Sequence, residues 1–379
     1  MRQNLFLKKA FECSERQYHE DSDGETVLML LQLLLTLLLA LAPVDIQATV
    51  EETKNHKLIK EEEYELGFIT TLLVNKKPLQ SLKSKYQQID VYENPYYFGK
   101  ILVLDDCIQL TERDASSYNE MMSHVALFDH PQPKRVLVIG GGDGYVVSEA
   151  LKHTSVTHVD HVELDEGVIE ISKAHFPWAN ATWDDPRVTL RVTDGAQFVR
   201  DAADGTYDVI IQDSSDPFVV EKDGKTTVLP SNVLYTPEHF AHMNRILSKH
   251  GVLAFQAETY NIPSSLTGIR EWRSVALRAG FKTVRYATIA IPTYSTGQIG
   301  MYVCNKQAQK VVENGVVEID AHERAALLQR FKALSGPTKY YHPRLQSSCF
   351  DLPYWVEAYI YADEENIDMS SSKPMGNEL

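Results

Sequence analysis

The chain of 379 residues has a formal net charge of −15, with 44% hydrophobic and 23% charged residues, a composition typical of a globular protein. An acidic surface without any lysine- or arginine-rich block would repel phosphates, so nucleic acid is not an expected partner. The same surface would attract cationic ligands, although most acidic proteins are simply soluble. The four cysteines form no CxxC pair. This argues against a zinc site or a disulfide scaffold and favours reduced thiols in a cytoplasmic protein.

Residues 1–60 are interpreted as an N-terminal extension that contains a dense apolar run at 26–42. At 17 residues this run is at the short limit for a membrane span. The flank before it is acidic, whereas a secretory signal peptide begins with a basic region. The alternatives that stay open are a membrane anchor, a secretory signal, a partner-binding helix and a gene-prediction artefact.

The next segment, 61–115, predicts a small β domain of short strands, with turn signals at Asn94-Pro95 and Phe98-Gly99. From 116 to 310, strand-like runs alternate with helical patterns. Strands are expected at 134–140, 156–165, 188–194, 207–213 and 251–258, and helices at 166–176 and 266–280.

The strand-like runs are rich in Val and Ile without strict alternation, which suits parallel strands that are buried on both faces. Alternating β and α elements then predict a Rossmann-like α/β domain with a doubly wound parallel sheet. The segments 283–294 and 297–305 have the spacing of a final hairpin. Residues 311–379 add a helical stretch and a polar tail.

A glycine-rich loop, GGGDGY (140–145), follows the first predicted strand of the sheet. Glycines allow a sharp turn and the close approach of a ligand to the backbone. A dinucleotide loop would need glycine in place of Tyr145, and an acid such as Asp143 would repel a pyrophosphate. The spacing with an internal acid resembles instead the nucleotide loop of S-adenosylmethionine-dependent methyltransferases. A tight turn without ligand is the alternative.

Further acids follow the next two strands. Glu163 ends the second strand about 20 residues after the loop, where a carboxylate can bind ribose hydroxyls. Asp165 could instead cap the following helix. Asp194-Gly195 follows the third strand, where an aspartate can accept a hydrogen bond from an adenine amino group. Each acid alone could be a helix cap, but acids at the carboxyl ends of successive parallel strands predict a nucleotide site at that edge.

The fourth strand ends in QDSSDP (212–217), which places Asp213 and Asp216 at the same edge of the sheet. Pro217 discourages helical geometry at Asp216. For a lone pair of aspartates in a loop, ordinary turn chemistry is the alternative.

Several motifs in this order resemble the spermidine synthase family of aminopropyltransferases over about residues 61–355. The motifs are YQQI (86–89), LVLDDCIQLTERDASSYNEM (102–121), VLVIGGGDG (136–144), VELDEGVI (162–169), DG (194–195), DSSDP (213–217), FQAE (255–258) and IPTYSTGQIG (291–300). The resemblance implies a small N-terminal β domain, a Rossmann-like catalytic domain of the methyltransferase type, and usually a homodimer.

The resemblance also implies a site. The cosubstrate would be decarboxylated S-adenosylmethionine, held by Gln87, Gly142, Asp143, Glu163, Asp194 and Gly195. Putrescine would lie near Tyr118, Asp216 and Tyr294, and Asp213 would orient one amine and accept its proton. The products would be spermidine and methylthioadenosine. No metal or other cofactor is expected, because the sulfonium is already a good leaving group and no ligand cluster is present.

Three departures from the family pattern bear on the amine preference. They are Asn119 where glutamine is common, Tyr145 in the glycine loop, and ETYNIPSS (258–265). The alternatives are a putrescine N-methyltransferase that uses intact S-adenosylmethionine, a spermine or thermospermine synthase, and a non-catalytic polyamine-binding subunit. Asp143 and Tyr294 argue against thermospermine synthase, and the presence of both Asp213 and Asp216 argues against a binding subunit.

Overall fold

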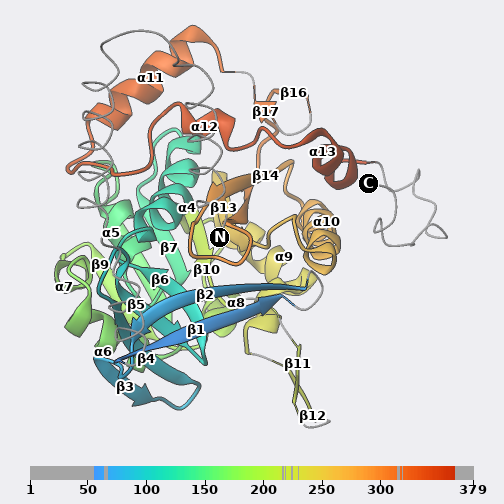
Figure 1. The fold of residues 1–379 in the computed structure, drawn as a ribbon. Coiled ribbons are helices and arrows are strands. Elements are labelled where there is room, and N and C mark those ends of the chain that lie inside the picture. The colour runs from blue at the N-terminus through green and yellow to red at the C-terminus, as the bar shows by residue number, and fades with distance from the viewer. Residues whose placement is uncertain are drawn as a thin grey trace, which may run out of the picture. The chain divides into compact units, whose positions relative to one another are not determined.

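The main feature of the fold is a seven-stranded sheet with the strand order β14-β15-β13-β10-β7-β8-β9 (Figure 1). The computed structural model describes residues 55–63, 67–215, 217, 219–222, 225–228, 230–313, 316–317 and 319–362. The strands of this sheet are β7 (Arg135–Gly140), β8 (His158–Glu163), β9 (Val188–Val192), β10 (Tyr207–Asp213), β13 (Leu247–Ala257), β14 (Thr283–Ala290) and β15 (Gln298–Asn305).

The strands lie where the sequence predicts them, with differences of a few residues at their ends. The neighbours from β13 to β9 are parallel, whereas β15 is antiparallel to both β13 and β14. The five strands expected to be parallel are parallel, and the predicted hairpin makes the whole sheet mixed. The last two strands form the predicted hairpin, and a short connection can join only antiparallel neighbours.

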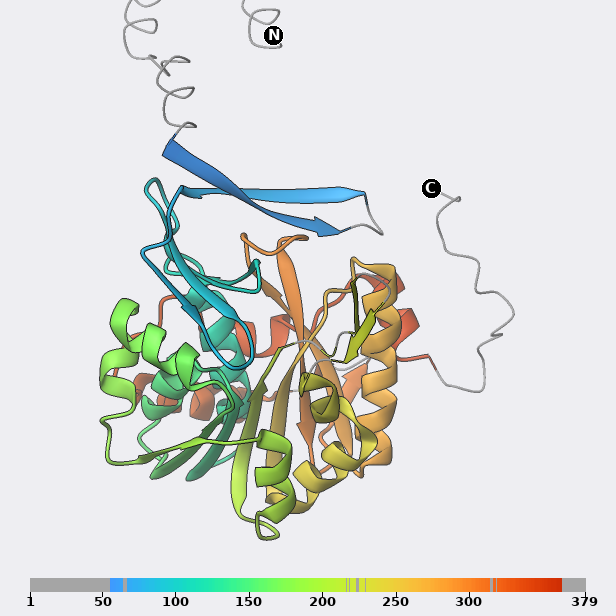
Figure 2. The same ribbon diagram turned by 90° about the horizontal axis from the view of Figure 1, so that it is seen from below.

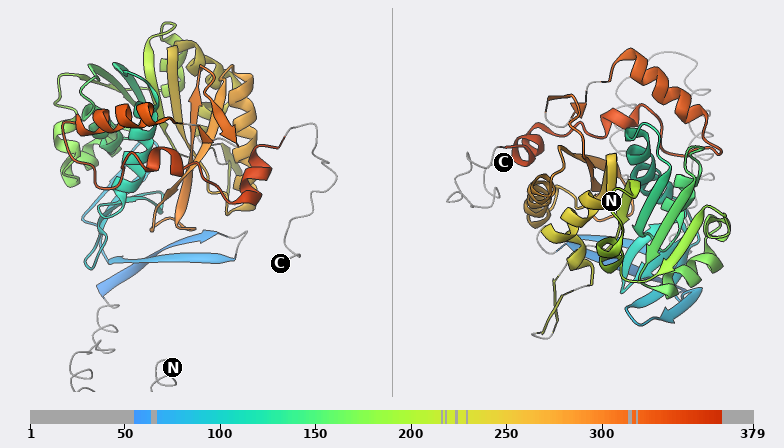
Figure 3. Two further views of the ribbon diagram at one scale, coloured as in Figure 1. Left: turned by 90° about the horizontal axis from the view of Figure 1, so that it is seen from above. Right: turned by 180° about the vertical axis from the view of Figure 1, so that it is seen from behind.

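Helices cover both faces of the sheet (Figure 3). Val136 and Val138 of β7 belong to one hydrophobic cluster, whereas Leu137 and Ile139 belong to a second cluster on the opposite face, as side-chain alternation along a strand requires. Burial on both faces explains the continuous apolar runs of the strands. The first face packs α4 (Ala115–Asp129), α5 (Tyr145–Leu151) and α11 (Ala321–Lys332), and the second packs α8 (Gly195–Asp201), α9 (Pro237–Ile246), α10 (Pro263–Arg278) and α13 (Tyr354–Ile360).

The N-terminal strands form a separate antiparallel sheet and a hairpin. Figure 2 shows the β1-β2 hairpin across the loop between β14 and β15, where Thr70 Oγ1 donates a hydrogen bond to the carbonyl oxygen of Ser295 at 3.3 Å. The hairpin consists of β1 (His56–Glu63) and β2 (Phe68–Asn75), and the four-stranded sheet of β3 (Gln80–Lys83), β4 (Gln88–Asn94), β5 (Gly99–Leu104) and β6 (Cys107–Thr111).

The predicted helices at 166–176 and 266–280 correspond to α6 (Glu166–His175) and α10. Helix α10 begins earlier than predicted because Pro263 at its first turn suits a helix start. The remaining elements are α7 (Ala179–Thr182), β11 (Val219–Lys222), β12 (Lys225–Val228), the 3₁₀ helix η2 (Pro230–Tyr235), β16 (Val311–Glu313), β17 (Val316–Val317) and α12 (Leu345–Ser348).

The predicted boundary at 115/116 falls after the first residue of α4, within a unit that extends from Leu58 to Leu379. The division into a small β domain, a catalytic domain and a C-terminal segment therefore stays a prediction. The apolar run at 26–42 and the polar tail after 362 lie outside the described residues. In the described part of the chain, no helix combines the length and apolar character needed to cross a membrane.

The segment after β15 returns to α4 and is fixed there by a buried carboxylate. Glu120 accepts hydrogen bonds from the backbone N–H groups of Lys339, Tyr340 and Tyr341 at 2.8, 2.7 and 2.7 Å. Because Glu120 is fully buried, these donors replace the water that its charge would otherwise need. Residues 339–341 are thus held in place by α4, the same helix that positions Tyr118.

A buried ion pair between α4 and β14 gives a test of the packing. Arg285 donates to Asp129 Oδ2 at 2.6 Å, and the Arg285 side chain is 3% exposed. Removal of one partner leaves an uncompensated buried charge, so we expect Asp129→Ala to lower the free energy of unfolding by about 3 kcal/mol in urea denaturation. Asp204, a largely exposed partner of Arg245, is the matched control, and Asp204→Ala should cost less than about 1 kcal/mol. Equal losses in the two variants would contradict this assignment.

Candidate active site

The order of the strands reverses between β7 and β10. After β7 the chain adds β8 and β9 on one side, and it then returns to add β10 and β13 on the other side. In open α/β sheets, ligands bind at the carboxyl ends of the strands in the crevice beside such a switch point. Gly140 at the end of β7 is the register partner of Asp213 at the end of β10. The glycine loop and Asp213 therefore flank the expected binding crevice.

The glycine loop packs closely against the end of β10. Gly140, Gly141 and Gly144 have positive φ angles of 77°, 64° and 77°, a conformation that favours glycine. A Cβ atom on Gly140 would overlap the carbonyl oxygen of Asp213. The N–H of Gly141 donates to that same oxygen at 2.8 Å. The glycines are thus needed both for the turn and for the contact with β10.

One predicted nucleotide-binding acid, Asp143, is part of this loop, and a second, Glu163, lies beside it. Asp143 Oδ1 accepts the backbone N–H of Tyr145 at 2.9 Å, and Glu163 Oε1 accepts that of Asp165 at 2.8 Å. A Cβ atom on Gly142 would lie 2.9 Å from Glu163 Oε2, so the loop backbone contacts this carboxylate directly. The structure brings Gly142, Asp143 and Glu163 together, while their roles in binding stay predictions.

Burial makes the ionised form of these carboxyl groups unfavourable. It raises the pKa of Asp143 and Glu163 to about 7 each, and that of Asp213 to about 6. The charge of Asp213 adds to the shift in the pKa of Asp143 and Glu163, and backbone hydrogen bonds oppose it. Buried carboxylates that repel one another favour a cationic ligand, because its charge would stabilise their ionised forms.

Asp213 is held by a tyrosine from a distant part of the chain. Tyr118 of α4 donates its hydroxyl proton to Asp213 Oδ1 at 2.7 Å, and this hydrogen bond opposes the rise in the pKa of Asp213. Gln256 Oε1, near the end of β13, lies 3.2 Å from the same hydroxyl. Gln256 belongs to the motif FQAE (255–258), for which the sequence predicted no role. Its place near the end of a parallel strand was the signal that could have identified it.

Tyr294, after β14, lies close to Tyr118. Burial, then Asp213 and then Tyr294 raise the pKa of Tyr118 well above its usual range. The hydroxyl of Tyr294 donates to the carbonyl oxygen of Gln109 at 3.1 Å. The structure thus brings the predicted Asp213, Tyr118 and Tyr294 into one group. Asp216 lies outside the described residues, and its contact with the amine stays a prediction.

Asp194 and Gly195 mark the start of α8. Asp194 Oδ1 accepts the backbone N–H groups of Ala196 and Gln197 at 2.8 and 3.2 Å, so this side chain caps the helix. A Cβ atom on Gly195 would lie 2.7 Å from Ile139 Cγ2, which explains the glycine by close helix–strand packing. The predicted contact of Asp194 with adenine stays a prediction.

Gln87 joins the four-stranded sheet to the end of β8. Its Nε2 donates to Asp165 Oδ2 at 2.9 Å, and Asp165 Oδ1 accepts the N–H of Gly167 at 3.0 Å. The helix-cap alternative for Asp165 is therefore confirmed. Because Asp165 donates its own N–H to Glu163, Gln87 lies near the predicted ribose-binding acid, although its contact with a ligand stays a prediction.

Two of the departures from the family pattern have structural explanations. Asn119 is buried, and its Nδ2 donates to the carbonyl oxygen of Ala115 one turn earlier at 2.8 Å. Its Oδ1 is buried without a hydrogen-bond partner among the described residues. Tyr145 is buried and stacks on Trp178 with ring centroids 4.6 Å apart. The bulky residue after the glycine loop is thus accommodated by aromatic packing.

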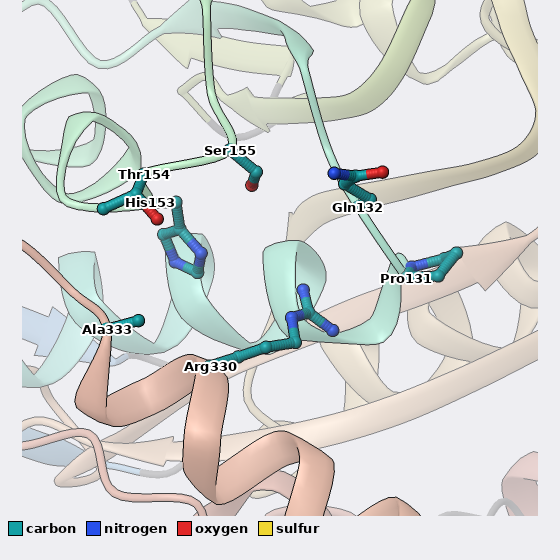
Figure 4. Close-up of a pocket in the computed structure, with 7 residues that line it drawn as sticks. All are labelled: Pro131, Gln132, His153, Thr154, Ser155, Arg330 and Ala333. Carbon is teal, nitrogen blue, oxygen red and sulfur yellow. The ribbon is translucent and has the colours of Figure 1, made fainter.

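A pocket of about 430 Å³ lies elsewhere, between α11 and the ends of α4 and α5 (Figure 4). Arg330 in this pocket donates to the carbonyl oxygens of Leu127, Phe128 and His130, so its guanidinium group satisfies the C-terminal end of α4. None of the predicted site residues belongs to the lining, so this pocket is not the candidate active site. The lining residues are Pro131, Gln132, His153, Thr154, Ser155, Arg330 and Ala333.

The raised pKa of Asp143 predicts that this residue lowers the stability of the unliganded protein by an amount that depends on pH. Its pKa is about 7 in the folded chain against an ordinary value of 3.8, so its contribution to stability is lost as the pH rises from about 4 to about 7. We expect Asp143→Asn, which keeps the acceptor for Tyr145, to stabilise the unliganded protein at pH 8 by about 2–4 kcal/mol, and by less at pH 5. Guanidinium denaturation at the two pH values measures this difference.

The matched control for this prediction is Asp194→Asn. It replaces an exposed capping carboxylate by an equally good cap and should give no such gain. A gain in Asp143→Asn that is the same at pH 5 and pH 8 would refute the explanation by burial.

Comparison with known proteins identifies the family. The profile described as the spermine/spermidine synthase domain matches residues 115–314, and that of the spermidine synthase tetramerisation domain matches residues 60–112. Spermidine synthase 2 of Hyoscyamus niger is 38% identical over 279 residues, which cover 73% of this chain and 84% of that protein. Spermidine synthase 1 of Pisum sativum is 38% identical over 286 residues, which cover 75% and 79%.

Solved structures agree with this result. A spermidine synthase in complex with the transition-state analogue AdoDATO is similar with a TM-score of 0.68 and 28% identity, over 80% of this chain and 95% of that one. The spermidine synthase of Thermotoga maritima gives a TM-score of 0.67 and 27% identity, over 80% and 94%. The chain therefore belongs to the spermine/spermidine synthase family.

Proposed function

We propose that this chain is a spermidine synthase, which transfers the aminopropyl group of decarboxylated S-adenosylmethionine to putrescine. The observation that supports this most directly is the meeting of the Tyr118–Asp213 pair with Asp143 and Glu163 at the switch point of the sheet. A base and a group of cation-attracting carboxylates then lie in one crevice. Membership of the family supports the same reaction.

The donor fits the carboxylates on one side of the crevice. Its sulfonium and its ammonium are both cationic, and it has no carboxylate that Asp143 would repel. Glu163 at the end of β8 is in the position that binds ribose hydroxyls in related sheets. Gln87 and Asp194-Gly195 complete the proposed donor site, and Gly142 allows the nucleoside to approach the loop backbone.

The acceptor fits the group formed by Tyr118, Asp213 and Tyr294, to which we add Asp216. An alkylammonium has a pKa of about 10.4, so it must lose a proton before its nitrogen can attack. Burial raises the pKa of Asp213 to about 6, which makes it a stronger base than an exposed aspartate. The pKa of the ammonium still exceeds that of Asp213 by about four, and desolvation of the amine on binding would lower its pKa and narrow this difference.

In the reaction, Asp213 takes one proton from the amine nitrogen, and that nitrogen attacks the carbon next to sulfur. The new C–N bond forms as the C–S bond breaks, and the electron pair of that bond stays on the sulfur of methylthioadenosine. The positive charge passes from sulfur to the nitrogen of spermidine. Tyr118 keeps Asp213 oriented toward the amine, and the alignment of donor and acceptor supplies the rest of the rate.

We also propose that the chain acts in the cytoplasm as a homo-oligomer, with a dimer as the simplest form. The match to a tetramerisation domain at 60–112 supports self-association through the N-terminal strands. The alternative location is a membrane or the secretory pathway, reached through the apolar run at 26–42.

The function is tested by turnover of the purified full-length chain with putrescine and either decarboxylated or intact S-adenosylmethionine. We expect spermidine and methylthioadenosine from the decarboxylated donor alone, resolved by mass spectrometry. Methylputrescine from the intact donor would instead identify a putrescine N-methyltransferase. A higher kcat/KM for spermidine than for putrescine would identify a spermine synthase.

The role of Asp213 is tested by Asp213→Asn, which keeps an acceptor for Tyr118 but cannot take up the proton. We expect kcat to fall by about 10²–10⁴, while the Kd of methylthioadenosine by titration calorimetry changes little. Asp208→Asn, at the opposite end of β10 where Asp208 accepts the N–H groups of Lys134 and Arg135, is the control with unchanged turnover. Near-normal turnover in Asp213→Asn would remove this residue from its role.

A further inference from the structure

One buried histidine of β8 contacts the glycine loop. His161 is 0% exposed, and its ring makes two hydrogen bonds. Trp183 Nε1 lies 2.9 Å from His161 Nδ1, and His161 Nε2 lies 2.7 Å from the carbonyl oxygen of Gly140. An indole N–H can only donate and a carbonyl oxygen can only accept. The imidazole must therefore be neutral, with its proton on Nε2.

The same tryptophan reaches the other end of the loop. A Cβ atom on Gly144 would lie 2.9 Å from Trp183 Cζ2, so the indole ring lies against the backbone there. The rings of His161 and Trp183 are nearly parallel, with an interplanar angle of 6° and centroids 5.9 Å apart. The His161–Trp183 pair thus contacts the loop at Gly140 and at Gly144.

On its opposite side, the loop is held by β10. Gly141 donates its N–H to the carbonyl oxygen of Asp213, while Gly140 accepts from His161. The segment between these contacts and Gly144 contains Gly142 and Asp143, which the proposed function assigns to the donor. A shift of the loop toward or away from β8 would therefore move Asp143 relative to both Glu163 and Asp213.

We propose that the His161–Trp183 pair is a positioning element that fixes the glycine loop for the nucleoside donor. The inference rests on the proposed function, since it takes the loop as the donor site. Neither side chain needs to touch the donor, because both act through the loop backbone. Burial lowers the pKa of His161 to about 4, which agrees with the neutral imidazole that the two hydrogen bonds require.

The pair predicts a specific kinetic signature. Loss of the imidazole would leave the Gly140 carbonyl and the Trp183 N–H without their buried partners. The loop would then relax from the geometry that the donor needs, while the group of Tyr118, Asp213 and Tyr294 stays in place. Donor KM should rise, whereas putrescine KM and kcat at saturating donor should change little.

The experiment compares full-length His161→Phe and His161→Gln with the wild type. Phenylalanine fills the space but cannot hydrogen-bond, whereas glutamine can donate to Gly140 and accept from Trp183. We expect His161→Phe to raise the donor KM and the calorimetric Kd of methylthioadenosine at least about tenfold, equivalent to about 1.4 kcal/mol. We expect His161→Gln to restore most of the affinity. His158→Phe changes a histidine at the start of the same strand and is the control with unchanged affinity.

Trp183→Phe keeps the aromatic ring but removes the donor to His161. This substitution should also weaken the binding of methylthioadenosine. If His161→Phe does not fold, Trp183→Phe alone tests the positioning role of the pair. Unchanged donor affinity in folded His161→Phe or in Trp183→Phe, or no recovery in His161→Gln, would overturn the inference while the function stands. Failure of the wild type to bind methylthioadenosine would overturn the proposed function and this inference together.

Discussion

The contact between the glycine loop and the end of β10 is the constraint on which the site depends. Gly140 fits against the carbonyl oxygen of Asp213 only because it has no side chain, and Gly141 donates to the same oxygen. This contact brings the proposed donor-binding loop and the proposed base within one crevice. The reversal of strand order at this point leaves the crevice open, because the connections after β7 and β10 leave the sheet in opposite directions.

The same crevice contains groups that lower the stability of the unliganded fold. Asp143, Glu163 and Asp213 are acids whose ionised forms are disfavoured by burial and, in two cases, by the charge of Asp213. A core built for stability alone would contain no such group. The stability lost here becomes binding energy when a cationic ligand enters, because its charge compensates the carboxylates. The charge of the proposed donor and acceptor thus explains why the fold contains these buried carboxyl groups.

The sequence predicted the strands, the glycine loop and the acids at the strand ends, because each depends on local patterns of burial and turn formation. It could not predict that Tyr118 donates to Asp213, since that contact joins residues 95 positions apart through tertiary packing. It also left Asp165 and Asp194 with two possible roles, because an aspartate after a strand suits both a helix cap and a ligand. Gln256 and His161 were missed for a similar reason. The role of a polar residue within a strand can be recognised only when the neighbouring strands and loops are known.

The anchoring of residues 339–341 on Glu120 has a consequence for the order in which the chain folds during synthesis. Glu120 is separated by 219 to 221 positions from the three backbone donors that stabilise its buried charge. Helix α4, with Tyr118 next to Asn119 and Glu120, leaves the ribosome long before these donors exist. The helix that orients the proposed base therefore reaches its final packing only after nearly the whole chain has been translated, and such long-range contacts form slowly. A nascent chain that stops short of residue 339 has the loop and the acids in its sequence but lacks the segment that completes the burial of α4.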